Sequence, residues 1–241
     1  MEVKTDAIVL KTVDYKDNDK ILTLFSPTLG RITAGAKGVK KPKAKLSFAA
    51  QPFCFAEYVL AEKGGRYTMT GAYLHESFFS LRYDIVRFYA ACAMAEVCLT
   101  VLYENESHEG LFIALIEGLK ALSLAEEDAA EAVIAFMLVA LRESGYPVDL
   151  SYEEECDGDI GEKLWFDFSD GKFAPFDRCE RGERASVSTY HTLRKCAGLN
   201  YDEEKLSGGN KRALRLLKAF LTDKTEEKYE NLGELIRLYE D

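Results

Sequence analysis

A run of cations with no acidic neighbour is the feature of this sequence with the clearest chemical use. Between positions 31 and 45 the chain has six Lys or Arg residues and no Asp or Glu. These cations are Arg31, Lys37, Lys40, Lys41, Lys43 and Lys45. Clustered cations bind a phosphate backbone because they release the counterions condensed on it, and this gain needs no precise geometry. We predict that the six side chains contact nucleic-acid phosphates; a solvated lysine loop is the alternative.

Aromatic residues follow directly after this run. They are Phe48, Phe53, Phe55 and Tyr58. An exposed ring stacks on a base and stabilises the complex by about 1–3 kcal/mol. A buried ring fills the core of the domain instead, which is the more frequent role of aromatic residues in a β-rich segment. The sequence leaves both roles open and favours the core.

The charge of the chain is divided by position. Residues 1–80 contain twelve Lys or Arg and eight Asp or Glu, a net charge of +4. The other 161 residues contain nineteen basic and thirty-three acidic side chains, a net charge of −14. The pI of about 5.0 is therefore set by the C-terminal two thirds. We expect a polyanion to bind at the N-terminal end, with the acidic remainder left to protein partners.

Two cysteines frame a segment with the spacing of a zinc ribbon. Cys156 lies three positions before Asp159, and Cys179 lies three positions before Gly182. Only two of the four ribbon positions are thiols, whereas a structural zinc needs four good ligands. The site would have to recruit Asp159 and a remote group such as His191. We therefore predict no metal and no other cofactor, and two unpaired cysteines at the base of a hairpin.

Patterns of known catalytic sites are incomplete. The three histidines, His75, His108 and His191, are far apart, and the sequence contains neither a G-x-S-x-G elbow nor a G-x-x-x-x-G-K-[ST] phosphate loop. In the segment LSGGN at 206–210 we interpret Ser207 as the N-cap of a following helix. We predict no catalytic residue and a protein that is not an enzyme. A metal-dependent enzyme is the alternative from another class.

Short strands must position the basic run. β-branched and aromatic residues predict strands at 7–10, 21–25, 31–34, 53–60 and 67–73. Turn residues at 26–30 and a Gly-Gly pair at 62–66 predict two hairpins. Five short strands indicate a small closed barrel of the OB-fold type, which often binds oligonucleotides. Strand number alone also allows an SH3-like barrel.

Helical periodicity begins near residue 74. It predicts helices at 81–102, 111–122, 133–141, 190–196, 211–221 and 229–239. Aromatic runs at 163–168 and 172–176 flank an Asp-Gly turn and predict a β-hairpin. We predict an α+β fold with an OB-fold barrel at 1–78 and a helical domain at 79–241. A small cysteine-bearing hairpin is inserted in this domain at about 151–185.

The N-terminal third resembles the RecO family of bacterial DNA repair and recombination mediators. The resemblance rests on AIVL at 7–10, DYKDNDKILTLF at 14–25, GRI at 30–32, AKGVKKPK at 36–43 and QPF at 51–53. It implies an OB-fold that binds single- and double-stranded DNA, anneals strands and helps load RecA onto DNA coated by single-stranded DNA-binding protein. It implies RecR and the acidic C-terminal tail of the coating protein as partners. Many relatives carry a four-cysteine zinc site, and Asp159 and Gly182 stand where two of those cysteines would be.

The cellular location is inferred from what the sequence lacks. No stretch approaches eighteen uncharged apolar residues, and the first residues lack the apolar run of a secretory signal. Six scattered cysteines fit a reducing compartment. We expect a cytoplasmic, nucleoid-associated protein. The alternative function is a protein-interaction adaptor that does not bind DNA itself.

Overall fold

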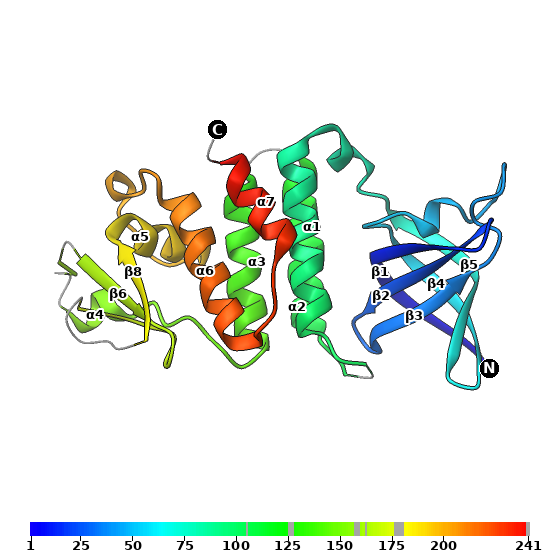
Figure 1. The fold of residues 1–241 in the computed structure, drawn as a ribbon, viewed down its shortest axis with the longest axis horizontal. Coiled ribbons are helices and arrows are strands. Elements are labelled where there is room, and N and C mark those ends of the chain that lie inside the picture. Colours follow the sequence, from blue (N-terminus) through cyan, green and yellow to red (C-terminus); the bar gives the residue numbers. More distant parts are fainter. Residues whose placement is uncertain (105, 125–127, 157–159, 162, 176–180, 240–241) are drawn as a thin grey trace.

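The computed structural model describes residues 1–104, 106–124, 128–156, 160–161, 163–175 and 181–239. A β-barrel forms one end of the molecule, and a helical body carries a small sheet at the other end (Figure 1). The helices α1 and α2 lie between the barrel and the remaining helices.

The barrel is built from five strands, β1 (Glu2–Tyr15), β2 (Asp19–Ser26), β3 (Gly30–Ala36), β4 (Phe55–Lys63) and β5 (Arg66–Glu76). They close in the order β1-β2-β3-β5-β4, with β1 paired to β4. Only β3 and β5 run parallel, through Ala34 opposite Tyr67 and Gly35 opposite Thr68. This closed five-stranded order is that of an OB-fold, so the predicted fold is confirmed.

The first strand explains how the barrel is attached to the helices. Its central residues 7–10 are all buried, although side chains on a strand alternate between two faces. Ala7 and Val9 pack inside the barrel with Leu22 of β2. Ile8 and Leu10 point to the other face and belong to the core of the helical body. The uninterrupted apolar run therefore serves two cores at once.

The helical body contains α1 (Ile85–Val101), α2 (Glu109–Leu124), α3 (Ala129–Glu143), α4 (Tyr152–Glu155), α5 (Val187–Cys196), α6 (Gly209–Thr225) and α7 (Glu230–Leu238). Short 3-10 turns lie at Phe48–Ala50, Phe79–Tyr83 and Glu203–Lys205. The helix predicted at 81–102 starts later, because Leu81 belongs to a 3-10 turn. Asp84 then adopts an extended conformation and caps α1 by accepting a hydrogen bond from Arg87 N at 3.0 Å.

The predicted hairpin is part of a three-stranded sheet. Its strands β6 (Lys163–Asp167) and β7 (Lys172–Pro175) pair as expected, and β8 (Gly182–Ser186) adds to the free side of β6. The third strand was not predicted because its sequence is polar and short. Phe166 anchors the sheet to α6 through an edge-to-face contact with Phe220, with ring centroids 5.1 Å apart.

The interpretation of Ser207 as a helix cap is wrong. Gly208, with φ of +67°, occupies the N-cap of α6, and no side chain caps the helix. The next residue, Gly209, allows α6 to approach α5 closely, since a Cβ there would lie 1.9 Å from Thr192 Oγ1. The Gly-Gly pair therefore serves helix packing. No described helix is both long enough and apolar enough to cross a membrane.

Candidate nucleic-acid interface

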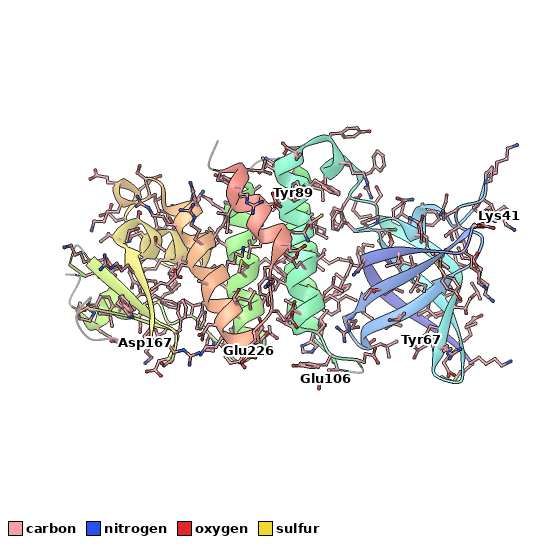
Figure 2. All side chains as sticks on the ribbon, in the orientation of Figure 1. Lys41, Tyr67, Tyr89, Glu106, Asp167 and Glu226 are labelled. Carbon is pink, nitrogen blue, oxygen red and sulfur yellow. The ribbon has the colours of Figure 1, made fainter. Side chains whose placement is uncertain are left out.

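Five of the six predicted cations lie in the connection between β3 and β4. Lys37, Lys40, Lys41, Lys43 and Lys45 are all exposed there. We call this segment, residues 37–45, the basic loop. Figure 2 shows Lys41 at the outer end of the barrel, on the side away from the helices. The acidic helical body therefore does not cover this lysine.

Hydrogen bonds connect the basic loop to the turn between β1 and β2. The backbone N of Lys40 donates to Asn18 O at 3.0 Å, and the backbone N of Gly38 donates to Asp19 Oδ1 at 2.7 Å. Lys40 Nζ also forms an ion pair with Asp14 Oδ2 at 2.6 Å. A hydrogen bond and the charge of Lys40 lower the pKa of Asp14. The run that lacks carboxylates in the sequence therefore meets carboxylates in space.

The sixth cation, Arg31, lies apart from the lysines. Its Nη1 donates to Leu99 O at the end of α1 at 3.0 Å, and its backbone N donates to Tyr103 O at 3.2 Å. It lines a cleft of about 690 Å³ whose other lining residues belong to the helical body. Arg31 therefore joins the two parts of the protein and does not extend the basic loop.

The four aromatic residues after the loop belong to the interior. Tyr58 is fully buried, and its hydroxyl donates to Ala49 O at 2.9 Å. Phe53 is buried, and the half-buried Phe55 packs on Phe112 of α2 with ring centroids 5.8 Å apart. Phe48 packs on the barrel core. Of the two roles left open by the sequence, the core role is the correct one for these rings.

A different pair of rings borders a groove on the outside of the barrel. The groove has a volume of about 530 Å³ and is lined by β2, β3, β5 and the ends of two hairpins. Tyr15, at the end of β1, is 48% exposed. Tyr67, near the start of β5 and labelled in Figure 2, is half-buried. Both line the groove. Tyr15 offers an exposed ring face for a stacked base, and Tyr67, which also packs against the barrel core, offers the part of its ring that borders the groove.

Cations surround these rings. Lys20, Lys37 and Arg66 line the groove together with one carboxylate, that of Asp19. Lys20 Nζ donates to Ala50 O at 3.3 Å, and Asp19 already accepts from the basic loop. Alternation along β3 buries Ile32, Ala34 and Ala36 and turns Thr33 and Gly35 toward the groove. The groove thus combines ring faces, the small β3 residues Thr33, Gly35 and Ala36, and positive charge.

Sequence reasoning missed most of these groove residues. Tyr15, Lys20, Arg66 and Tyr67 are far apart in the sequence, and the parallel pairing of β3 with β5 brings their strands together. A usable signal was present for Arg66 and Tyr67, which lie at the end of the Gly-Gly hairpin predicted at 62–66, whereas Tyr15 and Lys20 flank a β1–β2 turn that was not predicted. OB-fold barrels commonly bind oligonucleotides with the face of strands 2 and 3 and with the 1–2 and 4–5 loops.

The described residues do not fit the zinc site of the resemblance. Asp159 and Cys179 lie outside the described residues. A Cβ on Gly182 would lie 2.0 Å from Phe166 O and 2.8 Å from Trp165 Nε1, so this position has no room for a ligand side chain. The buried His191 uses Nδ1 to accept from Asp202 N at 3.2 Å. In the part of the chain that is described, no three His, Cys, Asp or Glu residues gather around a common point.

Together, the closed barrel with this groove and the attached helices define the class of protein as an OB-fold protein with a helical C-terminal part. Family models agree in detail. The model for the recombination protein O N terminal matches residues 1–78, and the model for the recombination protein O C terminal matches residues 82–232. The chain belongs to the RecO family.

Individual relatives carry the name DNA repair protein RecO. The relative from Acetivibrio thermocellus is 31% identical over 166 residues, which cover 69% of this chain and 66% of that protein. The Clostridium novyi relative is 35% identical over 153 residues, covering 64% of this chain and 59% of its own length. The Desulforamulus reducens relative is 30% identical over 244 residues, covering 98% of this chain and 94% of that protein. These relatives, of which the first two are covered to less than two thirds of their length, agree with the family models in placing the chain in the RecO family.

Proposed function

We propose that the chain binds single-stranded DNA across the barrel groove, with the basic loop holding the phosphate backbone. The observation that carries this proposal is the position of the lysines beside the groove: Lys37 belongs to both. Rings at Tyr15 and Tyr67 would stack on bases, and the five lysines of the basic loop would contact phosphates without reading sequence. Duplex DNA offers the same phosphates to the loop.

The biological role follows from the family. A protein that holds exposed bases on one surface can anneal complementary strands and help load RecA onto DNA coated by single-stranded DNA-binding protein. The proposed partners are RecR and the acidic C-terminal tail of the coating protein. We propose no catalytic step, no cofactor, and action in the cytoplasm at the nucleoid.

A salt titration tests the proposal. The affinity of the full chain for a fluorescent single-stranded oligonucleotide is measured by anisotropy between about 50 and about 200 mM salt. Five engaged lysines predict a slope of log K against log salt of about −3.5, or −0.7 for each phosphate. Lys41→Glu combined with Lys45→Glu is expected to weaken binding at least about tenfold, because two contacts become repulsive.

A matched control changes the same charge elsewhere. Lys120 and Arg142 are exposed cations of α2 and α3, and their double replacement by Glu leaves the barrel untouched. This control should keep the affinity of the wild-type protein. A flat salt response, or equal affinities of the loop variant and the wild-type protein, contradicts the proposal. Binding of RecR or of the acidic tail without any DNA binding would identify the chain as an adaptor.

A further inference from the structure

The helix α6 belongs to the acidic helical body, yet the charged residues along most of its length are all positive. Residues 209–222 of α6 contain four cations and no Asp or Glu. The cations are Lys211, Arg212, Arg215 and Lys218. The C-terminal 161 residues to which α6 belongs have a net charge of −14. The sign of the charge therefore reverses locally, far along the chain from the basic loop.

Helix periodicity places these cations on the outer face of α6. Leu214, Leu217 and Leu221 are fully buried and fix the inner face of the helix. Arg212 and Arg215 are exposed, and Lys211 and Lys218 are partly exposed. From Lys211 to Lys218 the helix rises by about 10 Å. The outer face is thus a row of cations along a rigid support.

A groove runs beside this row. The helices α6 and α7 border two hollows of about 570 and 620 Å³, and both hollows are lined by Lys218, Thr222, Gly233 and Arg237. Lys218 Nζ lies close to Gly233 of α7, since a Cβ at this position would be 2.8 Å from it. The ammonium group of Lys218 therefore lies between α6 and α7, beside both hollows. We call Lys211, Arg212, Arg215, Lys218 and Arg237 the α6 face.

Carboxylates also line the groove, and two of them already bind a cation. Asp223 Oδ1 accepts from Arg181 Nη2 at 2.6 Å, and Glu234 is paired with Arg237. Glu230 lines one hollow and Glu183 lines the other. The row of cations on α6 itself contains no carboxylate. An extended anion lying along α6 would meet successive cations and compete with the partners that they already have, such as Ser188, which accepts from Arg212 Nη1 at 3.2 Å.

The spacing and the lining favour a phosphate backbone as this anion. A specific peptide ligand needs accessible apolar surface for anchoring side chains. Most of the apolar lining is buried: Phe168, Tyr229 and Ile236 are at most 7% exposed, and Tyr89 and Ala219 are partly exposed. A nucleic acid needs only cations at intervals, because counterion release drives its binding.

We propose that the α6 face binds the phosphate backbone of a second nucleic-acid strand. The inference rests on the proposed function of the barrel, which holds the first strand. In Figure 1, α1 and α2 separate α6 from the barrel, so the two surfaces are distinct. One molecule that holds two strands raises the local concentration of one strand near the other, and annealing becomes faster without any further contact.

The test is a bridging experiment with the full chain. One oligonucleotide is immobilised on beads, and a second, non-complementary fluorescent oligonucleotide is captured only when the protein holds both. Arg215→Glu combined with Lys218→Glu is expected to lower capture by about tenfold or more, since two phosphate contacts become repulsive. Its affinity for one oligonucleotide should change by less than about twofold, because the barrel contacts remain. The loop variant Lys41→Glu with Lys45→Glu should lose both activities.

Two further variants keep the result interpretable. Arg215→Gln with Lys218→Gln removes the charges without adding repulsion and should lower capture to a smaller extent. Lys120→Glu with Arg142→Glu has the same charge change as the acidic α6 variant and should capture normally. Thermal unfolding of each variant shows whether the fold is retained.

The possible outcomes separate the two proposals. If the wild-type protein binds single oligonucleotides but does not bridge, or if the α6 variants bridge normally, the second-strand site is wrong and the barrel site stands. Normal bridging by an α6 variant that has lost binding to a polyglutamate peptide would assign the α6 face to an acidic protein and overturn the inference. Failure of the wild-type protein to bind any oligonucleotide would contradict the proposed function itself.

Discussion

Lys40 of the basic loop and Asp14 at the end of β1 form an ion pair across the outer end of the barrel, with 2.6 Å between Nζ and Oδ2. Both side chains keep contact with solvent, at 32% and 63% exposure. The pair occupies a lysine that the proposed DNA complex would use. A bound phosphate would therefore compete with Asp14 for the same ammonium group.

This competition predicts that removing a protein carboxylate strengthens DNA binding. Asp14→Asn frees Lys40 and removes one negative charge beside the loop, so affinity for single-stranded DNA should rise about two- to fivefold, the range of an exposed ion pair. The salt slope should stay close to the wild-type value, because DNA displaces Asp14 from Lys40 in the wild-type complex and the number of phosphate contacts is the same. Anisotropy titrations at several salt concentrations measure both quantities. Weaker binding by this variant would instead mean that the pair is needed to order the loop.

The position of Tyr67 in the groove predicts that its ring stacks on a base and that its hydroxyl group is not needed for DNA binding. Tyr67→Ala should weaken binding by about 1–3 kcal/mol if one base stacks on the ring, whereas Tyr67→Phe should retain affinity because the ring face is kept. Tyr73 lies on the same strand, is 63% exposed and does not line the groove, so Tyr73→Ala is the matched control. Equal losses for Tyr67→Ala and Tyr73→Ala would exclude stacking at Tyr67.

Much of the fold was predictable because local patterns determine it. Turn residues at 26–30 and at 62–66 specify two hairpins whose pairing the structure shows, Leu24 opposite Ile32 in one and Lys63 opposite Arg66 in the other. The strand β8 lacks an apolar pattern, so nothing in its sequence predicted it. Its place follows from pairing with β6, a contact that forms only in the folded protein.

The site was harder to predict because it depends on three-dimensional proximity. The run from 31 to 45 identified the basic loop, yet the same run included Arg31, whose guanidinium group faces the helices. It also hid the carboxylates of Asp14 and Asp19, which lie elsewhere in the sequence and beside the loop in space. Charge counted along a chain therefore overestimates the positive potential of a loop that another turn contacts.

The close contact between the barrel and the helical body at Gly30 predicts that an alanine substitution there lowers the stability of the protein more than one at Gly64. Gly30 has φ of +65°, and a Cβ there would lie 2.5 Å from Glu106 O and 2.6 Å from Tyr103 O. Gly64 has φ of +59° with nothing within 4 Å of its Cβ position. Both alanine variants suffer the left-handed backbone cost of about 1–2 kcal/mol, but only Gly30→Ala adds a steric cost of about 1–3 kcal/mol.

Thermal unfolding measures this difference. Each kcal/mol lowers the Tm of a protein of this size by about 2–4 °C, so Gly30→Ala should unfold several degrees below Gly64→Ala. Equal Tm values would mean that the segment around Tyr103 moves away to admit a methyl group, and the close contact between barrel and body would then contribute little to stability.

The buried imidazole of His191 links the stability of the helical body to pH. His191 is fully buried, and its Nδ1 accepts from the backbone N of Asp202 at 3.2 Å. Desolvation lowers its pKa below the ordinary value of 6.5. A proton on Nδ1 would also break the hydrogen bond to Asp202. The folded protein therefore binds a proton on this group less readily than the unfolded chain does.

This difference predicts a loss of stability in weak acid. The contribution of His191 is complete above pH 6.5, its value in the unfolded chain, and decreases as the pH falls from 6.5 toward the folded pKa, by at most about 1.4 kcal/mol per pH unit. His191→Asn keeps an acceptor for Asp202 N and does not titrate, so its unfolding free energy in urea should fall less between about pH 7 and about pH 5.5. If the unfolding free energies of His191→Asn and the wild-type protein change with pH in parallel, the imidazole binds its proton equally well in the folded and unfolded states.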